Sequence, residues 1–343
     1  MNSSILLIYT GGTIGMMEDP STGSLIPLDF DHIQDHVPEL RRFSVKLDVE
    51  SFADPIDSSD VSINTWQQLA EIIEKHYDRY DGFVILHGTD TMSYSASALS
   101  FMLENLAKPV IFTGSQLPIG KLRTDGKENL ITAIEIATAR RDGHPVIQEV
   151  AVFFESSLFR GNRTHKYNTE DFDAFESANL PALAQIGIHI FFNHAQLLRP
   201  SGPFRIYRDL NPNVGVLKIF PGINAGFIQG VLSAPGLKGL VLETFGSGNA
   251  PRETWFIDSL AQAIENGLCI INVTQCNEGF VEQGRYKTSS ALSRIGVVPG
   301  ADLTTEAALT KLMFLLGQGY HGDALTRQLM ASLRGELTAS SAW

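Results

Sequence analysis

The feature that most constrains the fold is an alternation of short β-branched runs with amphipathic helical segments. Four runs are bounded by polar or glycine residues and predict buried strands: ILLIY (5–9), GFVILH (82–87), PVIFTG (109–114) and EVAVFF (149–154). Helical patterns lie between them, as in residues 65–80, where Trp66, Leu69 and Ile73 share one face. This alternation predicts an α/β fold with a mostly parallel sheet covered on both faces.

The pattern breaks once along the 343 residues, a length that favours two domains. Residues 194–213 contain three prolines and no sustained period, so we expect a linker there. We therefore predict a larger N-terminal α/β domain at 1–193 and a smaller C-terminal α/β domain at 214–343.

Charge and composition exclude several classes of protein. Lysine and arginine number 26 against 38 acidic residues, a net charge of −12 that repels nucleic acid and anionic membranes. No apolar run approaches the ~20 residues of a membrane span, and the start carries no signal-peptide pattern. The two cysteines, Cys269 and Cys276, are too few for a disulfide framework. We expect a cytoplasmic protein with reduced thiols.

The first predicted strand runs into TGGTIG (10–15). A dinucleotide-binding G-x-G-x-x-G would be followed at once by a helix, whereas here the polar, turn-forming segment 16–27 follows. The glycine spacing also differs, and no P-loop G-K-[ST] is present, so a nucleotide site is disfavoured. The remaining alternatives are a sharp turn that exposes the Thr13 hydroxyl at the sheet edge and a tight turn with an incidental threonine. Residues 16–27 form either a lid or an inert surface loop.

Three further clusters follow predicted strands or precede helices. HGTDT (87–91) carries Thr89 and Asp90, which suit either a helix cap or a site for an ammonium group and a reacting carbonyl. DSSD (57–60) places Ser58 and Ser59 where they could bind a carboxylate or merely form a turn.

RGNRTHK (160–166) ends in Lys166, which is either a surface lysine or the partner of a catalytic threonine. As a base it must be neutral part of the time, which a nearby Asp90 carboxylate would oppose.

Metal chemistry has little support in the sequence. His32 and His36 have helical i, i+4 spacing but no acidic or third ligand, and the two cysteines are seven apart without a second pair. We expect no metal and no organic cofactor.

TGGTIG together with HGTDTM resembles the L-asparaginase family of bacterial type, closest to its cytoplasmic type I branch. The resemblance extends through DSSD, KPVIFTGSQLP, RGNRTHK, FGSGNAP, TQC and LRGELT, nearly the whole chain. It implies hydrolysis of L-asparagine to L-aspartate and ammonia without a cofactor. In that scheme Thr13 is the nucleophile that forms an acyl-enzyme, and Thr89, Asp90 and Lys166 form the second catalytic group.

The resemblance also assigns binding roles and an assembly. Ser58 and Ser59 would bind the substrate α-carboxylate, and Asp90 its α-amino group. Similar proteins are homotetramers, dimers of intimate dimers, with each site completed by another subunit. Asn249 and Tyr286 are the candidates for that contribution.

Three residues depart from the family pattern. Leu25 stands where many members have a lid tyrosine, so the hydroxyl partner of Thr13 would be Tyr286 or absent. Glu243 replaces an arginine used by some type I enzymes to bind asparagine as an activator, and His165 replaces a common threonine. The charge reversal at Glu243 predicts a lost or changed allosteric response.

Two other functions remain open at this point. A glutaminase-asparaginase of broader specificity is one, because a single methylene gives a pocket little discrimination. A non-catalytic amino-acid-binding regulatory protein is the other, although binding alone would not require all four residues Thr13, Thr89, Asp90 and Lys166.

Overall fold

The computed structural model describes residues 3–18, 25–27, 37–282 and 287–338 of the chain. It divides into two compact units, Met1–Ile206 and Tyr207–Trp343. Each unit is an α/β structure built on a sheet with parallel strands, which confirms the predicted fold class. The predicted domain bounds remain a prediction.

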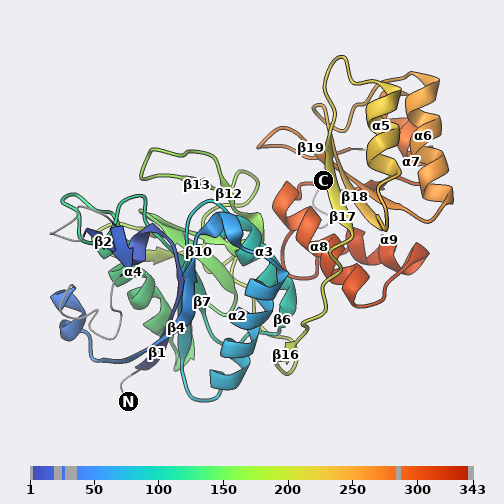
Figure 1. Cartoon of the computed structure of the whole chain (residues 1–343). Coiled ribbons are helices and arrows are strands. Elements are labelled where there is room, and N and C mark those ends of the chain that lie inside the picture. Colours follow the sequence, from blue (N-terminus) through green and yellow to red (C-terminus); the bar gives the residue numbers. More distant parts are fainter. Residues whose placement is uncertain (1–2, 19–24, 28–36, 283–286, 339–343) are drawn as a thin grey trace. The chain divides into compact units, whose positions relative to one another are not determined.

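The N-terminal unit has one large sheet among its described residues (Figure 1). In spatial order its eight strands are β15 (Ile190–Phe192), β14 (Ala184–Ile186), β11 (Ser157–Arg160), β10 (Val150–Phe154), β7 (Val110–Thr113), β5 (Gly82–Leu86), β1 (Ser3–Gly11) and β4 (Val45–Ile56). The run from β10 to β4 is parallel, and β11, β14 and β15 pair antiparallel. The carboxyl ends of β7, β5, β1 and β4 therefore lie at one edge.

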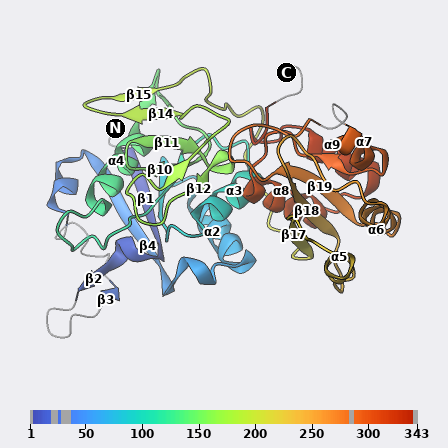
Figure 2. The ribbon, with the colours of Figure 1, turned by 90° about the horizontal axis from the view of Figure 1, so that it is seen from above.

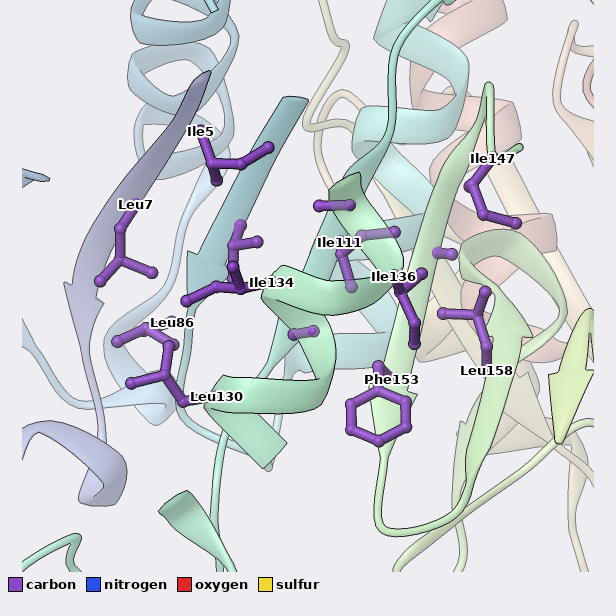
Figure 3. Close-up of a cluster of buried hydrophobic side chains, with 14 of the residues drawn as sticks. Ile5, Leu7, Leu86, Ile111, Leu130, Ile134, Ile136, Ile147, Phe153 and Leu158 are labelled. Atoms are coloured by element: carbon purple, nitrogen blue, oxygen red, sulfur yellow. The ribbon is translucent and has the colours of Figure 1, made fainter. Parts of the chain in front are cut away.

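Helices cover both faces of this sheet because its central strands alternate two apolar sets of side chains. The helix α4 (Gly126–Thr138) packs on one face, as Figure 3 shows. The contacting residues there include Leu7, Leu86, Ile111, Phe153, Leu130 and Ile134. The helices α2 (Ile63–His76) and α3 (Met92–Met102) lie against the other face (Figure 1).

Short elements connect these layers. Two-stranded pairs are formed by β2 (Met16–Glu18) with β3 (Leu25–Pro27), β6 (Leu103–Glu104) with β16 (Arg205–Ile206), β8 (Arg140–Arg141) with β9 (His144–Pro145), and β12 (His165–Lys166) with β13 (Phe175–Glu176). Short 3₁₀ turns are Thr13–Gly15, Pro38–Arg42, Ser58–Asp60 and Gly161–Arg163. The candidate lid 16–27 thus begins and ends as an antiparallel pair of strands.

The C-terminal unit has a parallel sheet of four described strands, β17 (Val214–Lys218), β18 (Gly239–Thr244), β19 (Cys269–Thr274) and β20 (Val298–Pro299). Its helices are α5 (Ala225–Leu232), α6 (Thr254–Glu265), α7 (Lys287–Arg294), α8 (Thr305–Gly317) and α9 (Gly322–Met330). Leu240, Leu242 and Ile270 pack against α5, α6 and α7, while α8 covers the opposite face (Figure 2). None of the described helices in either unit has the length and apolar character needed to cross a membrane.

Candidate active site

Three turns meet at the carboxyl edge of the N-terminal sheet, and two glycines make this possible. At Gly11 (φ 131°) a methyl group would lie 2.0 Å from the Ile56 carbonyl oxygen. At Gly12 (φ 86°) it would lie 2.5 Å from the Gly88 nitrogen and Cα. Side chains are excluded at both positions by contact and by the positive φ. The turn that presents Thr13 therefore packs directly on the turns that follow β4 and β5.

The third glycine of TGGTIG, Gly15, is required for a different steric reason. A methyl group on Gly15 would lie 2.2 Å from the ring of Tyr9, which is buried beneath the turn. The Tyr9 hydroxyl donates to the Gly15 carbonyl at 3.2 Å, and burial raises its pKa to about 12. Tyr9 therefore supports the turn from below as a neutral group. Thr13 begins the short 3₁₀ turn above it and is half-buried.

Lys166 joins the two other predicted catalytic residues. Its Nζ donates to Thr89 Oγ1 and to Asp90 Oδ1, both at 2.7 Å. The Lys166 side chain is 12% exposed and that of Asp90 is 65% exposed, so the group has a sheltered side and an open side. Thr89 lies between strand β5 and helix α3, whereas Lys166 is in β12. The structure thus brings together residues 77 positions apart.

A buried chain of hydrogen bonds holds the turn before Thr89. Trp66 Nε1 donates to Ser95 Oγ at 2.9 Å, and Ser95 Oγ lies 2.9 Å from His87 Nε2. His87 Nδ1 lies 2.7 Å from the Gly88 carbonyl oxygen, and burial lowers the His87 pKa to about 4. A neutral ring satisfies both ends if Nδ1 carries the proton and Nε2 accepts from Ser95.

The sequence pattern gives His87 no role beyond its place in HGTDT and predicts Trp66 only as a core residue. The signal available was a histidine and a tryptophan in apolar surroundings, since each must satisfy a polar nitrogen when buried.

The DSSD turn lies beside the same group. Ser58 is buried, and its Oγ would be 2.6 Å from a methyl group on Gly88. Thr91 Oγ1 donates to the Ser58 carbonyl at 2.6 Å, which ties this turn to the one carrying Thr89. Ser59 is exposed, and its N–H and hydroxyl both donate to Asp57 Oδ1 at 2.9 Å, which lowers the Asp57 pKa.

Other predicted residues fall elsewhere. Asn249 belongs to the C-terminal unit, where it exchanges backbone hydrogen bonds with Phe245 and lines a hollow of about 720 Å³. Tyr286 lies outside the described residues, as do His32 and His36. Leu25 is in β3 opposite Glu18, and its side chain is outside the description. His165 is opposite Glu176 in the β12–β13 pair. Within the described ranges no group of three or more metal-ligating side chains gathers.

The chain combines a two-unit α/β fold with a threonine, a lysine and an aspartate in contact at one site. This combination defines a class of protein, which comparison with known families identifies. The family model for the N-terminal asparaginase domain matches residues 4–198, and that for the glutaminase/asparaginase C-terminal domain matches residues 213–330. The chain belongs to the asparaginase family.

Within this family the chain is most informatively compared with individual proteins. The chain is 45% identical to L-asparaginase 1 of Escherichia coli K12, over 98% of both chains. The crystal structure of L-asparaginase I from Vibrio cholerae has a TM-score of 0.89 and 40% identity, covering 98% of this chain and 100% of that one. A mouse 60 kDa lysophospholipase is 42% identical over 97% of this chain and 62% of that protein. The predicted resemblance to type I L-asparaginases is confirmed.

Proposed function

We propose that this enzyme hydrolyses L-asparagine to L-aspartate and ammonia through a threonine nucleophile. The observation that carries the proposal is the contact of Lys166 Nζ with both Thr89 Oγ1 and Asp90 Oδ1, beside the glycine turn that presents Thr13. A hydroxyl bonded to a lysine is a known arrangement for nucleophilic and proton-transfer chemistry. Similarity to L-asparaginases over the full chain supports the substrate assignment.

The first step would form an ester on Thr13. Its Oγ1 attacks the side-chain amide carbon, a C–O bond forms, and the C–N bond breaks as the proton lost by Thr13 Oγ1 is delivered to the nitrogen, which leaves as ammonia. Donors around Thr89 would stabilise the oxyanion. In the second step water attacks the ester carbon, the C–O bond to Thr13 breaks, and the water proton passes by way of the Thr89–Lys166 pair to Thr13 Oγ1, which restores the threonine and releases aspartate.

Substrate binding would use the charged and polar groups around this centre. The exposed side of Asp90 suits the α-ammonium group, because it leaves carboxylate oxygen available beyond the contact with Lys166. Ser58, in the turn against Gly88, suits the α-carboxylate. Ser59 would have to release its hydroxyl from Asp57 to join it.

The test is ammonia release from asparagine by the wild type, Thr13→Ala and Thr13→Ser. We expect Thr13→Ala to lower kcat by about 10³-fold or more, and Thr13→Ser to keep measurable turnover because it keeps a hydroxyl. Equal activity in the wild type and Thr13→Ala would exclude Thr13 as the nucleophile. Inactivity of every form, with asparagine still bound, would favour the amino-acid-binding alternative.

Glutamine provides the second arm of the same assay. The two substrates differ by one methylene, for which a pocket discriminates by about 1–3 kcal/mol. We expect kcat/KM to favour asparagine by at least that margin, roughly 10-fold or more. Comparable values for both amides would favour the glutaminase-asparaginase alternative.

The proposal includes a homotetramer in the cytoplasm, with Asn249 and Tyr286 reaching the site of another subunit. Co-expression of Thr13→Ala with Asn249→Ala chains tests this arrangement. If the site is shared, mixed assemblies regain part of the activity that each variant lacks alone. Absence of any recovery in assemblies verified to contain both chains would place Asn249 in its own subunit's site or in none.

A further inference from the structure

A fourth strand-end segment, Gly114–Leu117, follows β7 and lies against the turn that carries Thr89. A methyl group on Gly114 would be 2.4 Å from the His87 carbonyl oxygen and 3.5 Å from Thr89 Cγ2. The His87 N–H also donates to the Thr113 carbonyl at 3.0 Å. The start of this segment is therefore in direct contact with the backbone that positions Thr89.

The same segment reaches the hairpin that carries Lys166. Gln116 Nε2 donates to the Asp171 carbonyl at 2.9 Å, and Asp171 lies in the loop joining β12 to β13. Within that loop Asn168 Oδ1 accepts from the Glu170 and Asp171 N–H groups at 2.8 and 3.1 Å. Gln116 thus holds an internally bonded loop that follows Lys166.

The order of strands explains why this segment lies beside the turn that carries Thr89. Strand β7 lies between β5, which leads to Thr89, and β10, whose neighbour β11 leads toward Lys166. Strand β11 is antiparallel to β10 and ends at the opposite edge of the sheet, so the Lys166 hairpin is reached through the contact of Gln116 with Asp171. A shift of the segment would therefore move Thr89 and the Lys166 hairpin relative to each other, and change the 2.7 Å contact between Lys166 Nζ and Thr89 Oγ1.

Two side chains at the start of α4 hold the segment. Asp125 accepts from the Gln116 N–H at 2.9 Å and from the Leu117 N–H at 3.1 Å. Asn129, which is 1% exposed, donates to the Gly114 carbonyl at 2.9 Å and to Asp125 Oδ2 at 3.2 Å. Its Oδ1 accepts from the Glu155 N–H at 3.0 Å, in the turn between β10 and β11.

We propose that Asp125, Asn129 and Gln116 are positioning residues that set Thr89 and Lys166 against each other through the Gly114–Leu117 segment. They form a continuous path of hydrogen bonds and close contacts from the start of α4 to both catalytic segments. None of the three is required to touch substrate. Displacements of about 1 Å at a catalytic contact lower turnover by up to about 10²-fold. Loss of these positioning bonds should therefore have a measurable effect on kcat.

The first experiment uses Asp125→Asn and Gln116→Ala with matched controls. Asp125→Asn replaces one of the two oxygens that accept from the Gln116 and Leu117 N–H groups by an NH₂ group, and Gln116→Ala removes the exposed hydrogen bond to the Asp171 carbonyl. We expect kcat for asparagine to fall by about 10-fold and 3-fold respectively, with KM within about 2-fold.

The controls make equivalent bonds in the same unit. Asp81→Asn disturbs a carboxylate that accepts from the Ser4 N–H and hydroxyl, and Gln148→Ala removes a glutamine bond to the Ala107 carbonyl. We expect both controls to keep the wild-type kcat.

The second experiment does not depend on turnover. Hydrogen–deuterium exchange of peptides covering residues 86–92 and 164–168 should be faster in Asp125→Asn than in the wild type, and unchanged in Asp81→Asn. The activity arm rests on the proposed function, and a wild type that releases no ammonia from asparagine would refute that function alone. Unchanged hydrogen–deuterium exchange at both segments in folded Asp125→Asn would overturn the proposed positioning role. If that variant does not fold, the same comparison on Gln116→Ala decides.

Discussion

Two lysine–carboxylate pairs in this chain have nearly the same bond length and opposite surroundings. Lys166 Nζ lies 2.7 Å from Asp90 Oδ1, with the two side chains 12% and 65% exposed. Lys311 Nζ lies 2.6 Å from Glu336 Oε1, with both side chains 0% exposed. The distance between the charges therefore does not distinguish a candidate catalytic pair from a structural one.

The remaining partners of each lysine make the distinction. Lys311 Nζ also donates to the carbonyls of Leu329 and Ala331 at 2.8 and 2.6 Å, which close the end of α9. Glu336 accepts from the Leu333 and Arg334 N–H groups at 2.9 and 2.6 Å. Backbone groups satisfy this pair completely, whereas the further bond of Lys166 goes to the Thr89 hydroxyl. A lysine that bonds a reactive hydroxyl, in a pair with one exposed side, is arranged as in a catalytic site.

The largest expected effect tests the open pair. Lys166→Met removes both donated hydrogen bonds, and we expect kcat for asparagine to fall by about 10²–10⁴-fold, the range of lost proton-transfer catalysis. The urea midpoint should stay near that of the wild type, because a partly exposed pair contributes little to folding. Ammonia release and urea unfolding on the same preparation check both. Wild-type turnover would remove Lys166 from the mechanism.

The buried pair should respond in the opposite way. Lys311→Met leaves the Glu336 carboxylate buried without its cation, and we expect a loss of about 3–5 kcal/mol of unfolding free energy. At low temperature, kcat per folded molecule should stay within about 2-fold of wild type. The double variant Lys311→Met/Glu336→Gln should recover most of the stability, since no unpaired charge remains. A double variant as unstable as the single one would contradict this account.

The comparison also shows what could be predicted from sequence. Strands β1, β5, β7 and β10 were predictable because they are apolar on both faces and bounded by glycine or polar residues. The predicted linker 194–213 is partly attached to the N-terminal unit. Leu198 N–H donates to Glu149, and β16 pairs with β6. Such long-range bonds leave no periodic pattern in a proline-containing segment.

The candidate site was predictable only where motifs carried a resemblance. Thr89 and Lys166 are far apart in sequence, and no local spacing connects them. The steric reasons for Gly12 and Gly15 lie in Gly88 and in the ring of Tyr9, which only the fold brings near. His87 and Trp66 read as ordinary apolar-face residues, although their ring nitrogens form one buried chain.

His87 extends the comparison to a buried base that is neutral in the folded state. Burial lowers its pKa from the ordinary 6.5 to about 4. Between these values the unfolded chain binds the proton and the folded chain does not, so stability is fully present above pH 6.5 and falls as the pH drops toward 4. At 1.36 kcal/mol per pH unit, the loss at pH 4 is about 3 kcal/mol.

The reference for this effect is His87→Asn, which cannot titrate. Between pH 7 and pH 4 the wild type should lose about 3 kcal/mol more unfolding free energy than the variant. The chain has three tryptophans, so replacing Trp255 and Trp343 by Phe leaves Trp66 in the hydrogen-bonded chain as the reporter. Parallel pH curves for the two proteins would mean that the pKa of His87 is the same in the folded and unfolded chain, and would contradict the effect of burial.

The smallest expected effect concerns Glu243 in the C-terminal unit, a carboxylate whose exposure lies between those of Glu336 and Asp90. Glu243 accepts from Thr305 Oγ1 at 2.5 Å and lies 3.7 Å from Lys218 Nζ, with its side chain 13% exposed. Its charge is already paired within the unit and would repel the carboxylate of an asparagine effector. We therefore expect hyperbolic asparagine kinetics, and a change in kcat of less than about 2-fold in Glu243→Gln.

Sigmoidal kinetics that disappear on substitution of Thr274 or Cys276 would show that an effector site persists. These two residues line a separate hollow of about 340 Å³, and the Cys276 N–H donates to Thr274 Oγ1 at 3.0 Å. Glu243→Arg sharpens the test, because it restores a positive charge at this position while leaving Lys166 and Thr89 untouched. If the arginine variant gains a sigmoidal response that the wild type lacks, charge at residue 243 controls the response. If both stay hyperbolic, the charge at residue 243 controls no asparagine response, and the Glu243 carboxylate is left with its bond from Thr305 Oγ1.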